Sequence, residues 1–292
     1  MDYYENKRVL LTGASSGLGY AILQRLANVK NCRTIAAVRN KSKMDGIISS
    51  LSTAEGVELY VAHLDLDQTD AVITHCISSA FRVFGGIDIV INCAGMGFRG
   101  LVKETVLETD RRILQVDYFA QVLIIKAIQR LWLESGASTG DIVQISSVQG
   151  FFGLGDRAPY SAAKHAISGF IDSLRVEIDS YPSRSSFRVI NVCPGHIATS
   201  HSVNALTGDG STYCHSDPST DEGYDPAYVA LELLVRASKG EREIVIAPSK
   251  VHALIYLRIL APSLCFRLTR NLFRQTRESI LKTIMKWVLN RD

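Results

Sequence analysis

The sequence lacks the patterns that mark zinc-binding, disulfide-rich or nucleotide-hydrolysing proteins. Its six cysteines include no Cys-x-x-Cys pair and no Cys/His spacing suited to zinc, so we expect reduced, incidental thiols and no metal site. No Gly-Lys-Ser/Thr motif is present, which argues against a P-loop nucleotidase. With 32 Lys and Arg against 29 Asp and Glu, the net charge of +3 gives no reason to expect a nucleic-acid partner.

An apolar leader is also missing from the beginning of the sequence. Residues 1–8, MDYYENKR, pass directly into a predicted strand, so we expect neither a signal peptide nor an N-terminal anchor. Positive charge is concentrated at the other end: residues 251–292 hold eight basic and two acidic side chains.

A chain of 292 residues that is 47% hydrophobic suits one sizeable α/β domain. Apolar runs of strand length alternate with stretches of helical period, which predicts a doubly wound, Rossmann-like parallel sheet in residues 1–250, followed by a helical extension, 251–292. The expected strands are Lys7–Thr12, Thr34–Val38, Val57–Leu64, Ile87–Asn92, Asp141–Ser146, Phe187–Val192 and Glu243–Ala247. The expected helices include Gly17–Val29, Val106–Glu134 and Tyr160–Asp179.

The segment Tyr-Ser-Ala-Ala-Lys at 160–164 carries the clearest chemical signal. Tyr160 and Lys164 lie one helical turn apart on one face, and a fixed cation favours the phenolate form of a nearby tyrosine. That brings the phenol closer to useful acid/base strength. Ser147, at the end of a predicted strand, could hydrogen-bond the oxygen of a carbonyl or alcohol while Tyr160 moves the proton. A Tyr-x-x-x-Lys pattern often arises by chance on an exposed helix, so the other motifs in the chain decide whether it indicates catalysis.

A glycine-rich turn after the first strand supplies part of that context. Gly13, Gly17 and Gly19 are spaced G-x-x-x-G-x-G between a predicted strand and helix, where backbone N–H groups can hold a pyrophosphate. Arg39 follows the second strand, where an acidic residue would favour NAD and an arginine accommodates the 2′-phosphate of NADP. We therefore expect NADP(H). The alternative for Arg39 is a solvated side chain at a strand end.

The order of these features resembles the short-chain dehydrogenase/reductase family. Glycine loop, Asn92-Cys-Ala-Gly95, Ser147, Tyr160-x-x-x-Lys164 and Pro194-Gly-x-x-x-Thr199 follow one another from about residue 7 to residue 248. Within the family, segments 92–100 and 202–211 look most like the dehydrogenase/reductase member 7 group. The resemblance implies these cofactor-binding residues: Gly13, Ser15, Ser16, Gly17, Leu18, Gly19, Arg39, Asp65, Leu66, Asn92, Ala94, Gly95, Tyr160, Lys164, Pro194, Gly195, Ile197 and Thr199.

The catalytic residues implied by the resemblance are Ser147, Tyr160 and Lys164, with one departure. The family completes a proton relay with an Asn in a pattern like N-x-x-G, whereas this chain has Asp117 in Val-Asp-Tyr-Phe-Ala. Burial would raise the pKa of Asp117 and Lys164 would lower it, and both outcomes stay open at this point. We interpret Asp117 as a tuned or weakened relay residue.

Two further segments bear on the substrate. Residues 199–225 are rich in turn formers and predict a flap over the substrate, with a disordered insertion as the alternative. In 251–292, basic residues interleave with apolar ones at helical spacing, which suits an anionic membrane surface. Packing on the domain or on another subunit is the competing interpretation.

These observations predict an NADP(H)-dependent oxidoreductase that interconverts a carbonyl and an alcohol on a lipophilic molecule such as a steroid, a retinoid or a lipid-derived carbonyl. The alternative is a non-catalytic NADP(H)-binding sensor or scaffold at a membrane surface. We also expect a homo-oligomer on the cytoplasmic side, associated with the endoplasmic reticulum or another intracellular membrane.

Overall fold

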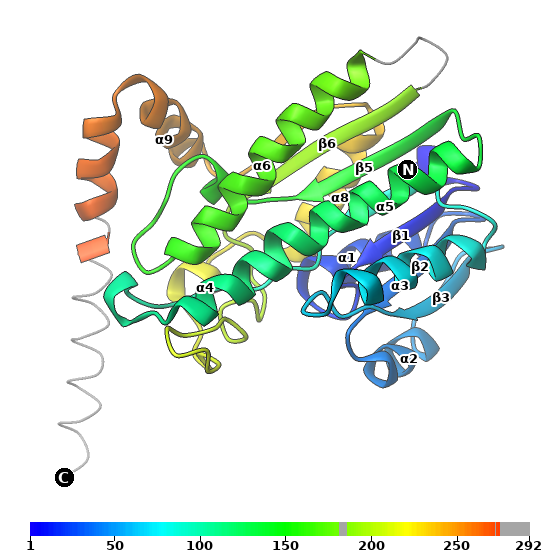
Figure 1. Ribbon diagram of the computed structural model, residues 1–292, viewed down its shortest axis with the longest axis horizontal. Coiled ribbons are helices and arrows are strands. Elements are labelled where there is room, and N and C mark those ends of the chain that lie inside the picture. Colours follow the sequence, from blue (N-terminus) through cyan, green and yellow to red (C-terminus); the bar gives the residue numbers. More distant parts are fainter. Residues whose placement is uncertain (181–185, 272, 275–292) are drawn as a thin grey trace.

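Parallel strands form one central sheet in the computed structural model, which describes residues 1–180, 186–271, 273 and 274 (Figure 1). The strand order in these residues is β3-β2-β1-β4-β5-β6-β7, and every neighbouring pair is parallel. The strands are β1 (Arg8–Thr12), β2 (Arg33–Val38), β3 (Glu58–His63), β4 (Ile89–Asn92), β5 (Thr139–Ile145), β6 (Ser186–Pro194) and β7 (Glu243–Ile246). The predicted doubly wound sheet is confirmed.

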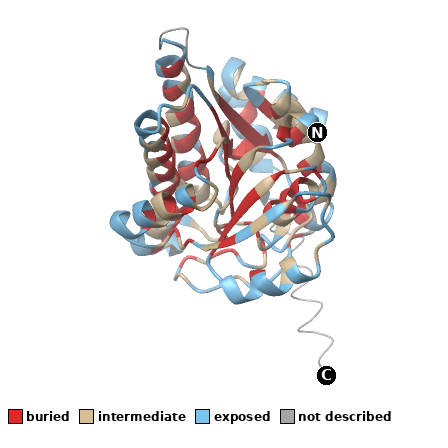
Figure 2. Ribbon diagram, turned by 90° about the vertical axis from the view of Figure 1, so that its right-hand side faces the viewer, coloured by how far each residue is buried: buried red, intermediate tan, exposed pale blue. Residues whose placement is uncertain are grey.

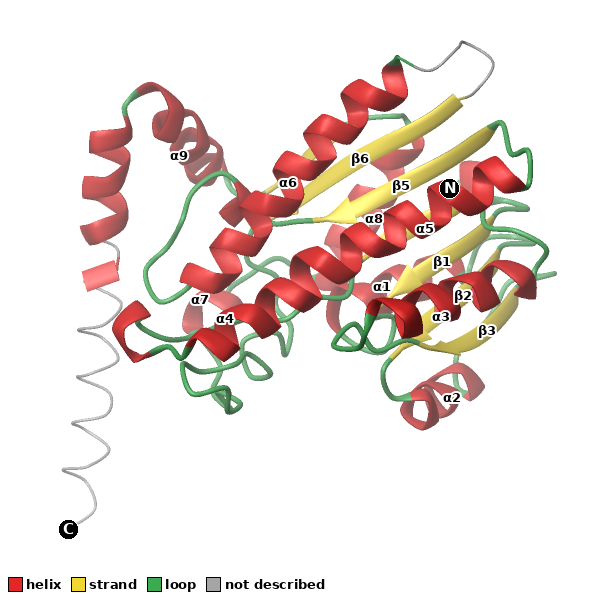
Figure 3. Cartoon of the chain, viewed as in Figure 1, coloured by secondary structure: helices red, strands yellow, loops and turns green. Residues whose placement is uncertain are grey.

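Helices cover both faces of this sheet (Figure 3). The α-helices are α1 (Gly17–Leu26), α2 (Lys41–Ser49), α3 (Asp70–Val83), α4 (Leu107–Leu114), α5 (Ala120–Glu134), α6 (Ala158–Asp179), α7 (Pro218–Asp221), α8 (Pro226–Ser238) and α9 (Ser249–Leu260). Short 3-10 turns are η1 (Asp2–Tyr4), η2 (Val102–Glu104) and η4 (Val148–Gly150), and a π-helical turn, η3 (Gln115–Phe119), joins α4 to α5.

Alternate residues of each strand enter the two halves of the core. Val9 and Leu11 of β1 pack on the side of α1 and α8, whereas Leu10 packs on the side of α3, α5 and α6. Side chains alternate between the faces of a strand, so a strand covered on both sides is apolar along its whole length. Figure 2 shows the strands as a largely buried layer between helices.

One predicted helix differs in the structure. The range Val106–Glu134 is helical from Leu107 but is not uniformly α-helical, because the π turn η3 lies between α4 and α5. A π turn holds one residue more than an α turn and is frequent at functional sites. Hydrophobic periodicity alone does not reveal such an extra residue. Asp117 lies in this turn.

The C-terminal extension is only partly described. Helix α9 is followed by a second helical segment over residues 262–271. Of the basic, apolar extension predicted for 251–292, residues 272 and 275–292 lie outside the described residues. Within the described residues, no helix combines the length and apolarity needed to cross a bilayer.

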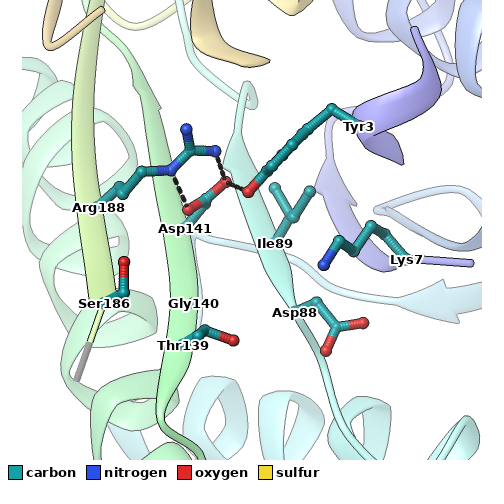
Figure 4. Close-up of a pocket in the computed structure, with 9 residues that line it drawn as sticks. All are labelled: Tyr3, Lys7, Asp88, Ile89, Thr139, Gly140, Asp141, Ser186 and Arg188. Atoms are coloured by element: carbon teal, nitrogen blue, oxygen red, sulfur yellow. Dashed lines mark hydrogen bonds and ion pairs between the residues drawn. The ribbon is translucent and has the colours of Figure 1, made fainter. Parts of the chain in front are cut away.

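A hollow of about 290 Å³ lies at the amino-terminal edge of the sheet (Figure 4). Three of its polar side chains pair with one another: Arg188 Nε donates to Asp141 at 2.7 Å, and the Tyr3 hydroxyl donates to the same carboxylate at 2.6 Å. Ligands of open α/β sheets bind at the opposite, carboxyl ends of the strands. The functional site is therefore expected at the carboxyl edge of the sheet.

Candidate active site

The glycine loop after β1 makes close backbone contacts that exclude side chains. Gly13 has φ +72°, and a Cβ added there would lie 2.8 Å from the Cα of Ala94. A Cβ on Gly19 would overlap the carbonyl of Gly13. Thr12 Oγ1 accepts hydrogen bonds from the backbone N–H groups of Cys93 and Ala94, each at 3.0 Å. The loops that follow β1 and β4 are thus held together at the point where the strand order reverses, the usual dinucleotide crevice of such folds.

A third segment reaches the same crevice from β6. Thr199 lies against Gly17, since a Cβ on Gly17 would be 3.3 Å from Thr199 Cγ2. The backbone N–H of Gly195 donates to Ile246 on β7 at 2.9 Å, and Ile197 forms a parallel bridge with Tyr224. The structure therefore brings the Pro194–Thr199 segment to the amino terminus of α1, where N–H groups without helical partners favour an anion.

Other predicted cofactor residues occupy different settings around the crevice. Arg39 is exposed at the end of β2. Asp65 is partly buried, and its Oδ1 accepts from the backbone N–H of Asp67 at 3.1 Å, so it supports its own turn and does not cap α3. The side chains of Leu18 and Leu66 belong to the core, which leaves their backbone groups for a ligand. Ser16 is the residue immediately before α1, with Ser15 preceding it.

Asn92 lies beneath the crevice. Its side chain is fully buried and donates to Gln144 at 3.3 Å and to the backbone carbonyl of Gln121 at 3.5 Å. Gln121 in turn donates to the backbone carbonyl of Ala94 at 2.8 Å. Asn92 and Gln121 therefore tie β4 and its following loop to α5. Direct contact of Asn92 with a cofactor stays a prediction.

Tyr160 and Lys164 lie on one face of α6, as their spacing predicts. Lys164 Nζ is 5.4 Å from the centre of the Tyr160 ring. Ser147 begins the η4 turn after β5, and its hydroxyl accepts from the backbone N–H of Gln149 at 3.1 Å. Burial raises the pKa of Tyr160, whereas Lys164 and hydrogen bonding to Ser147 lower it, and the net direction is upward. The three predicted catalytic side chains thus meet at one place.

The neighbouring Ser146 has a structural partner instead. Its hydroxyl lies 3.0 Å from the hydroxyl of Ser168 and 3.4 Å from the backbone carbonyl of Lys164, beneath α6. This geometry leaves Ser147 as the serine that accompanies Tyr160.

Asp117 forms a buried ion pair with Lys164. Its side chain is fully inaccessible, Oδ1 accepts from the backbone N–H of Met96 at 2.7 Å, and Oδ2 lies 3.4 Å from Lys164 Nζ. Burial raises the pKa of Asp117, and this outweighs the opposing effects of Lys164 and Met96. Burial lowers the pKa of Lys164, but Asp117 together with Tyr160 and Cys93 raises it, and the net direction is upward. Asp117 also raises the pKa of Tyr160, so it opposes part of the effect of Lys164.

The turn-rich segment 199–225 is folded against the domain. Arg99 N–H donates to Leu206 at 2.8 Å, and Val106 N–H donates to Gly208 at 2.9 Å. Arg99 and Arg157 both pair with one oxygen of Asp217, at 2.5 and 3.0 Å, and all three side chains are at most 13% exposed. The segment is thus fastened to the loops after β4 and before α6.

Several site residues carried no recognisable signal in the sequence. Thr12, Gln121 and the Arg99–Asp217–Arg157 cluster act through partners distant in the chain. His201 is exposed in a turn of the docked segment, and its ring makes an edge contact with Tyr160 at 5.9 Å between ring centres. Only Thr12 had a positional clue, because it ends the strand that feeds the glycine loop.

Comparison with known proteins agrees with this arrangement. The short chain dehydrogenase family model matches residues 7–209. The chain is 34% identical over 282 residues to dehydrogenase/reductase SDR family member 7B of Bos taurus, covering 95% of this chain and 84% of the relative. It is 36% identical over 266 residues to SDR family protein 7-like of Drosophila melanogaster, covering 89% and 78%. The chain belongs to the short-chain dehydrogenase/reductase family of oxidoreductases.

Solved structures extend the comparison to the fold. A short-chain dehydrogenase from Sphingobium yanoikuyae in complex with NADPH superimposes with a TM-score of 0.69 at 26% identity, covering 88% of this chain and 95% of that one. A Burkholderia phymatum short-chain dehydrogenase in complex with NAD gives 0.76 at 19% identity, covering 90% and 96%. The two neighbours carry different nicotinamide dinucleotides.

Proposed function

We propose that this protein is an NADP(H)-dependent oxidoreductase that interconverts a carbonyl and an alcohol on a lipophilic small molecule. The observation that carries the proposal is the convergence of Ser147, Tyr160 and Lys164 beside the glycine crevice. A hydride carrier is required because no protein side chain supplies a hydride.

The crevice fits a dinucleotide. Gly13 and Gly19 allow the glycine loop to fold tightly, because a Cβ at either position would meet backbone atoms, and this loop leads into the amino terminus of α1. Gly13, Gly17 and Thr199 would border the phosphates, Asp65 and Leu66 the adenine, and Arg39 a 2′-phosphate. The bound nicotinamide would supply the hydride chemistry.

The chain itself would handle the proton and the substrate oxygen. In carbonyl reduction, the Tyr160 hydroxyl gives its proton to the carbonyl oxygen while the Ser147 hydroxyl donates a hydrogen bond to that oxygen. In alcohol oxidation, Tyr160 takes the proton back. Lys164 stabilises the phenolate, and by resemblance its ammonium also holds the ribose hydroxyls.

The surroundings of Tyr160 support an apolar substrate. Tyr160 packs against a cluster that includes the buried Phe98, Ala163 and Leu206, with Met96 beside it. Apolar walls with a few placed polar groups are typical of small-molecule sites. A steroid, a retinoid or a lipid-derived carbonyl suits such walls.

Substitution of the tyrosine tests the chemistry. In an NADPH-oxidation screen of lipophilic carbonyls, we expect Tyr160→Phe to lower kcat/KM by about 10²–10⁴-fold while NADPH binding persists, because only the transferable proton is lost. Tyr228→Phe on the exposed face of α8 is the matched control. Turnover that survives in Tyr160→Phe would refute the assigned chemistry. Dinucleotide binding without turnover of any carbonyl would favour the non-catalytic sensor or scaffold.

Cofactor choice is tested at Arg39. Among the described residues no carboxylate forms an ion pair with Arg39, so its charge is available to a 2′-phosphate. Loss of a charged hydrogen bond costs about 1.5–3 kcal/mol, so Arg39→Ala should weaken NADPH binding by about 10–100-fold and leave NADH binding unchanged. Arg33→Ala, at the other end of β2, is the control. Equal NADPH affinity in wild type and Arg39→Ala would contradict the NADP preference.

Assembly and location follow as parts of the same proposal. A homo-oligomer would form through the outer faces of α5 and α6. The protein would act on the cytoplasmic side of the endoplasmic reticulum or another intracellular membrane, where lipophilic substrates partition.

A further inference from the structure

The C-terminal hairpin, which we define as α9 with residues 262–271, 273 and 274, has a fixed inner side. Ile255 is buried in a cluster with Val148 and Phe152, which follow the catalytic Ser147. The ring of Phe273 lies against Gly155, in the loop that leads to Tyr160. The hairpin is therefore packed on the segment between two catalytic residues. Figure 1 shows α9 and the helical segment after it at one side of the molecule, beyond that loop.

The outer side of the hairpin is apolar and uncovered. Ile259 is 72% exposed and Leu260 is 81% exposed. Of the sixteen large hydrophobic side chains that are exposed in the described part of the chain, six belong to this short region: Tyr256, Ile259, Leu260, Leu264, Phe266 and Leu268. Scattered exposed apolar residues are normal in proteins, but a concentration of them marks an interaction surface.

The same hairpin carries charge of one sign. Residues 249–274 include five basic side chains and no acidic one; the basic residues are Lys250, Arg258, Arg267, Arg270 and Arg274. None of the five forms an ion pair with another described residue, and no described ion pair involves a residue after Glu243. Arg258 lies 4.9 Å from the ring centre of Phe266, so cation and apolar surface are interleaved. The hairpin thus offers uncompensated positive charge beside exposed Ile, Leu and Phe.

Exposed apolar side chains next to positive charge fit some binding partners of the hairpin better than others. Two copies meeting through the hairpin about a twofold axis would bring like charges together. A nucleic acid would use the cations but leave the aliphatic side chains in water. The surface of an anionic bilayer satisfies both, because apolar side chains enter the acyl boundary while Lys and Arg meet anionic headgroups.

We propose that the outer side of the C-terminal hairpin binds the surface of an anionic lipid bilayer. The proposal deepens the proposed function by naming the partner and the contact. It also places the loop between Ser147 and Tyr160 next to the membrane, the source of a lipophilic substrate.

Vesicle co-sedimentation of the full chain tests the proposal without any turnover assay. We expect binding to phosphatidylcholine vesicles that contain about 30% phosphatidylserine to exceed binding to pure phosphatidylcholine by at least about tenfold, since basic residues near an anionic surface are attracted to its headgroups. High salt should reduce the difference.

Two pairs of substitutions separate the contributions. Ile259→Ser with Leu260→Ser should reduce vesicle binding by at least about tenfold, because two aliphatic side chains would no longer be removed from water in the acyl boundary. Arg267→Gln with Arg270→Gln should reduce binding to anionic vesicles only. Val102→Ser with Leu107→Ser removes two similarly exposed apolar side chains, 74% and 62%, that lie outside the hairpin and outside α5 and α6, and should leave binding intact. Thermal stability and NADPH binding report whether each variant is folded.

Three outcomes would overturn the proposal. The first is equal binding to neutral and anionic vesicles. The second is undiminished binding in the Ile259/Leu260 variant together with loss of binding in a chain ended at Arg274, which would assign the membrane contact to residues 275–292. The third is a change in sedimentation mass of the Ile259/Leu260 variant without a change in vesicle binding, which would identify self-association. A protein that binds vesicles but turns over no carbonyl would leave the hairpin proposal standing and refute only the enzymatic one.

Discussion

The glycine crevice and the neighbouring segment 199–225 are held in place by different forces. At the crevice, glycines allow close approach: Gly13 lies against the backbone of Ala94, and Gly17 against the side chain of Thr199. At segment 199–225, side chains fasten loops to one another, most clearly where Arg99 and Arg157 share Asp217. The first arrangement depends on the absence of side chains, and the second depends on buried charges. Substitutions should therefore damage the two regions in different ways.

Removal of the shared carboxylate should have the largest effect on stability. Asp217→Ala leaves the guanidinium groups of Arg99 and Arg157 buried without their common partner, which costs about 3–5 kcal/mol for a broken buried pair. We expect the urea midpoint to fall and protease cleavage within 199–225 to accelerate. Glu222→Ala, an exposed carboxylate in the same segment, should change neither. An unchanged urea midpoint in Asp217→Ala would show that the cluster does not fasten the segment.

A smaller effect, confined to the crevice, is expected at the glycine turn. Gly13→Ala forces a side chain into a backbone conformation that costs about 1–2 kcal/mol and brings its Cβ against Ala94. The affinity for NADPH and NADH should fall together, by at least about tenfold, in a fluorescence titration. Gly46→Ala on α2 meets no atom within 4 Å and is the control. Selective loss of one dinucleotide would contradict a purely steric role.

The smallest expected effect is at Asp117, which lies between the glycine crevice and Tyr160. Asp117 raises the pKa of Tyr160, so Asp117→Asn should lower it. Alcohol oxidation needs the phenolate, and its rate rises with pH through the pKa of Tyr160. The rising limb of the kcat/KM profile should therefore move to lower pH in Asp117→Asn.

The matched control for this profile is Asp110→Asn on α4. A limb that stays in place in Asp117→Asn, or that moves equally in Asp110→Asn, would show that the Asp117 carboxylate does not act on Tyr160.

The sequence was informative where local spacing determines geometry. Tyr160 and Lys164 share a helix face because they are four residues apart, and the glycine turn is constrained by its neighbours in the chain. The thirteen-residue spacing between Ser147 and Tyr160 favours Ser147 over Ser146, and the contact of Ser146 with Ser168 agrees with this.

The remainder depends on partners far apart in the chain. Asp217 is 118 residues from Arg99, and Asn92 is 52 residues from Gln144, so no local pattern reports either contact. The direction of the pKa shift of Asp117 was also open in the sequence. It depends on how far the carboxylate is buried relative to its distance from Lys164, and only the packing around it gives that. The preference for NADP(H) stays a prediction, because an exposed Arg39 reveals no 2′-phosphate by itself.

The π turn at 115–119 also bears on how this helix can be redesigned. A single residue deleted from the turn would restore a continuous α-helix and leave α4 and α5 in nearly the same orientation, because a π turn accommodates one extra residue between two helical segments. Asp117 lies in this turn, so the deletion would alter the contact of its carboxylate with Lys164 while the sheet-facing side chains of α5 keep their places. One codon can therefore change this buried ion pair without changing how either helix packs.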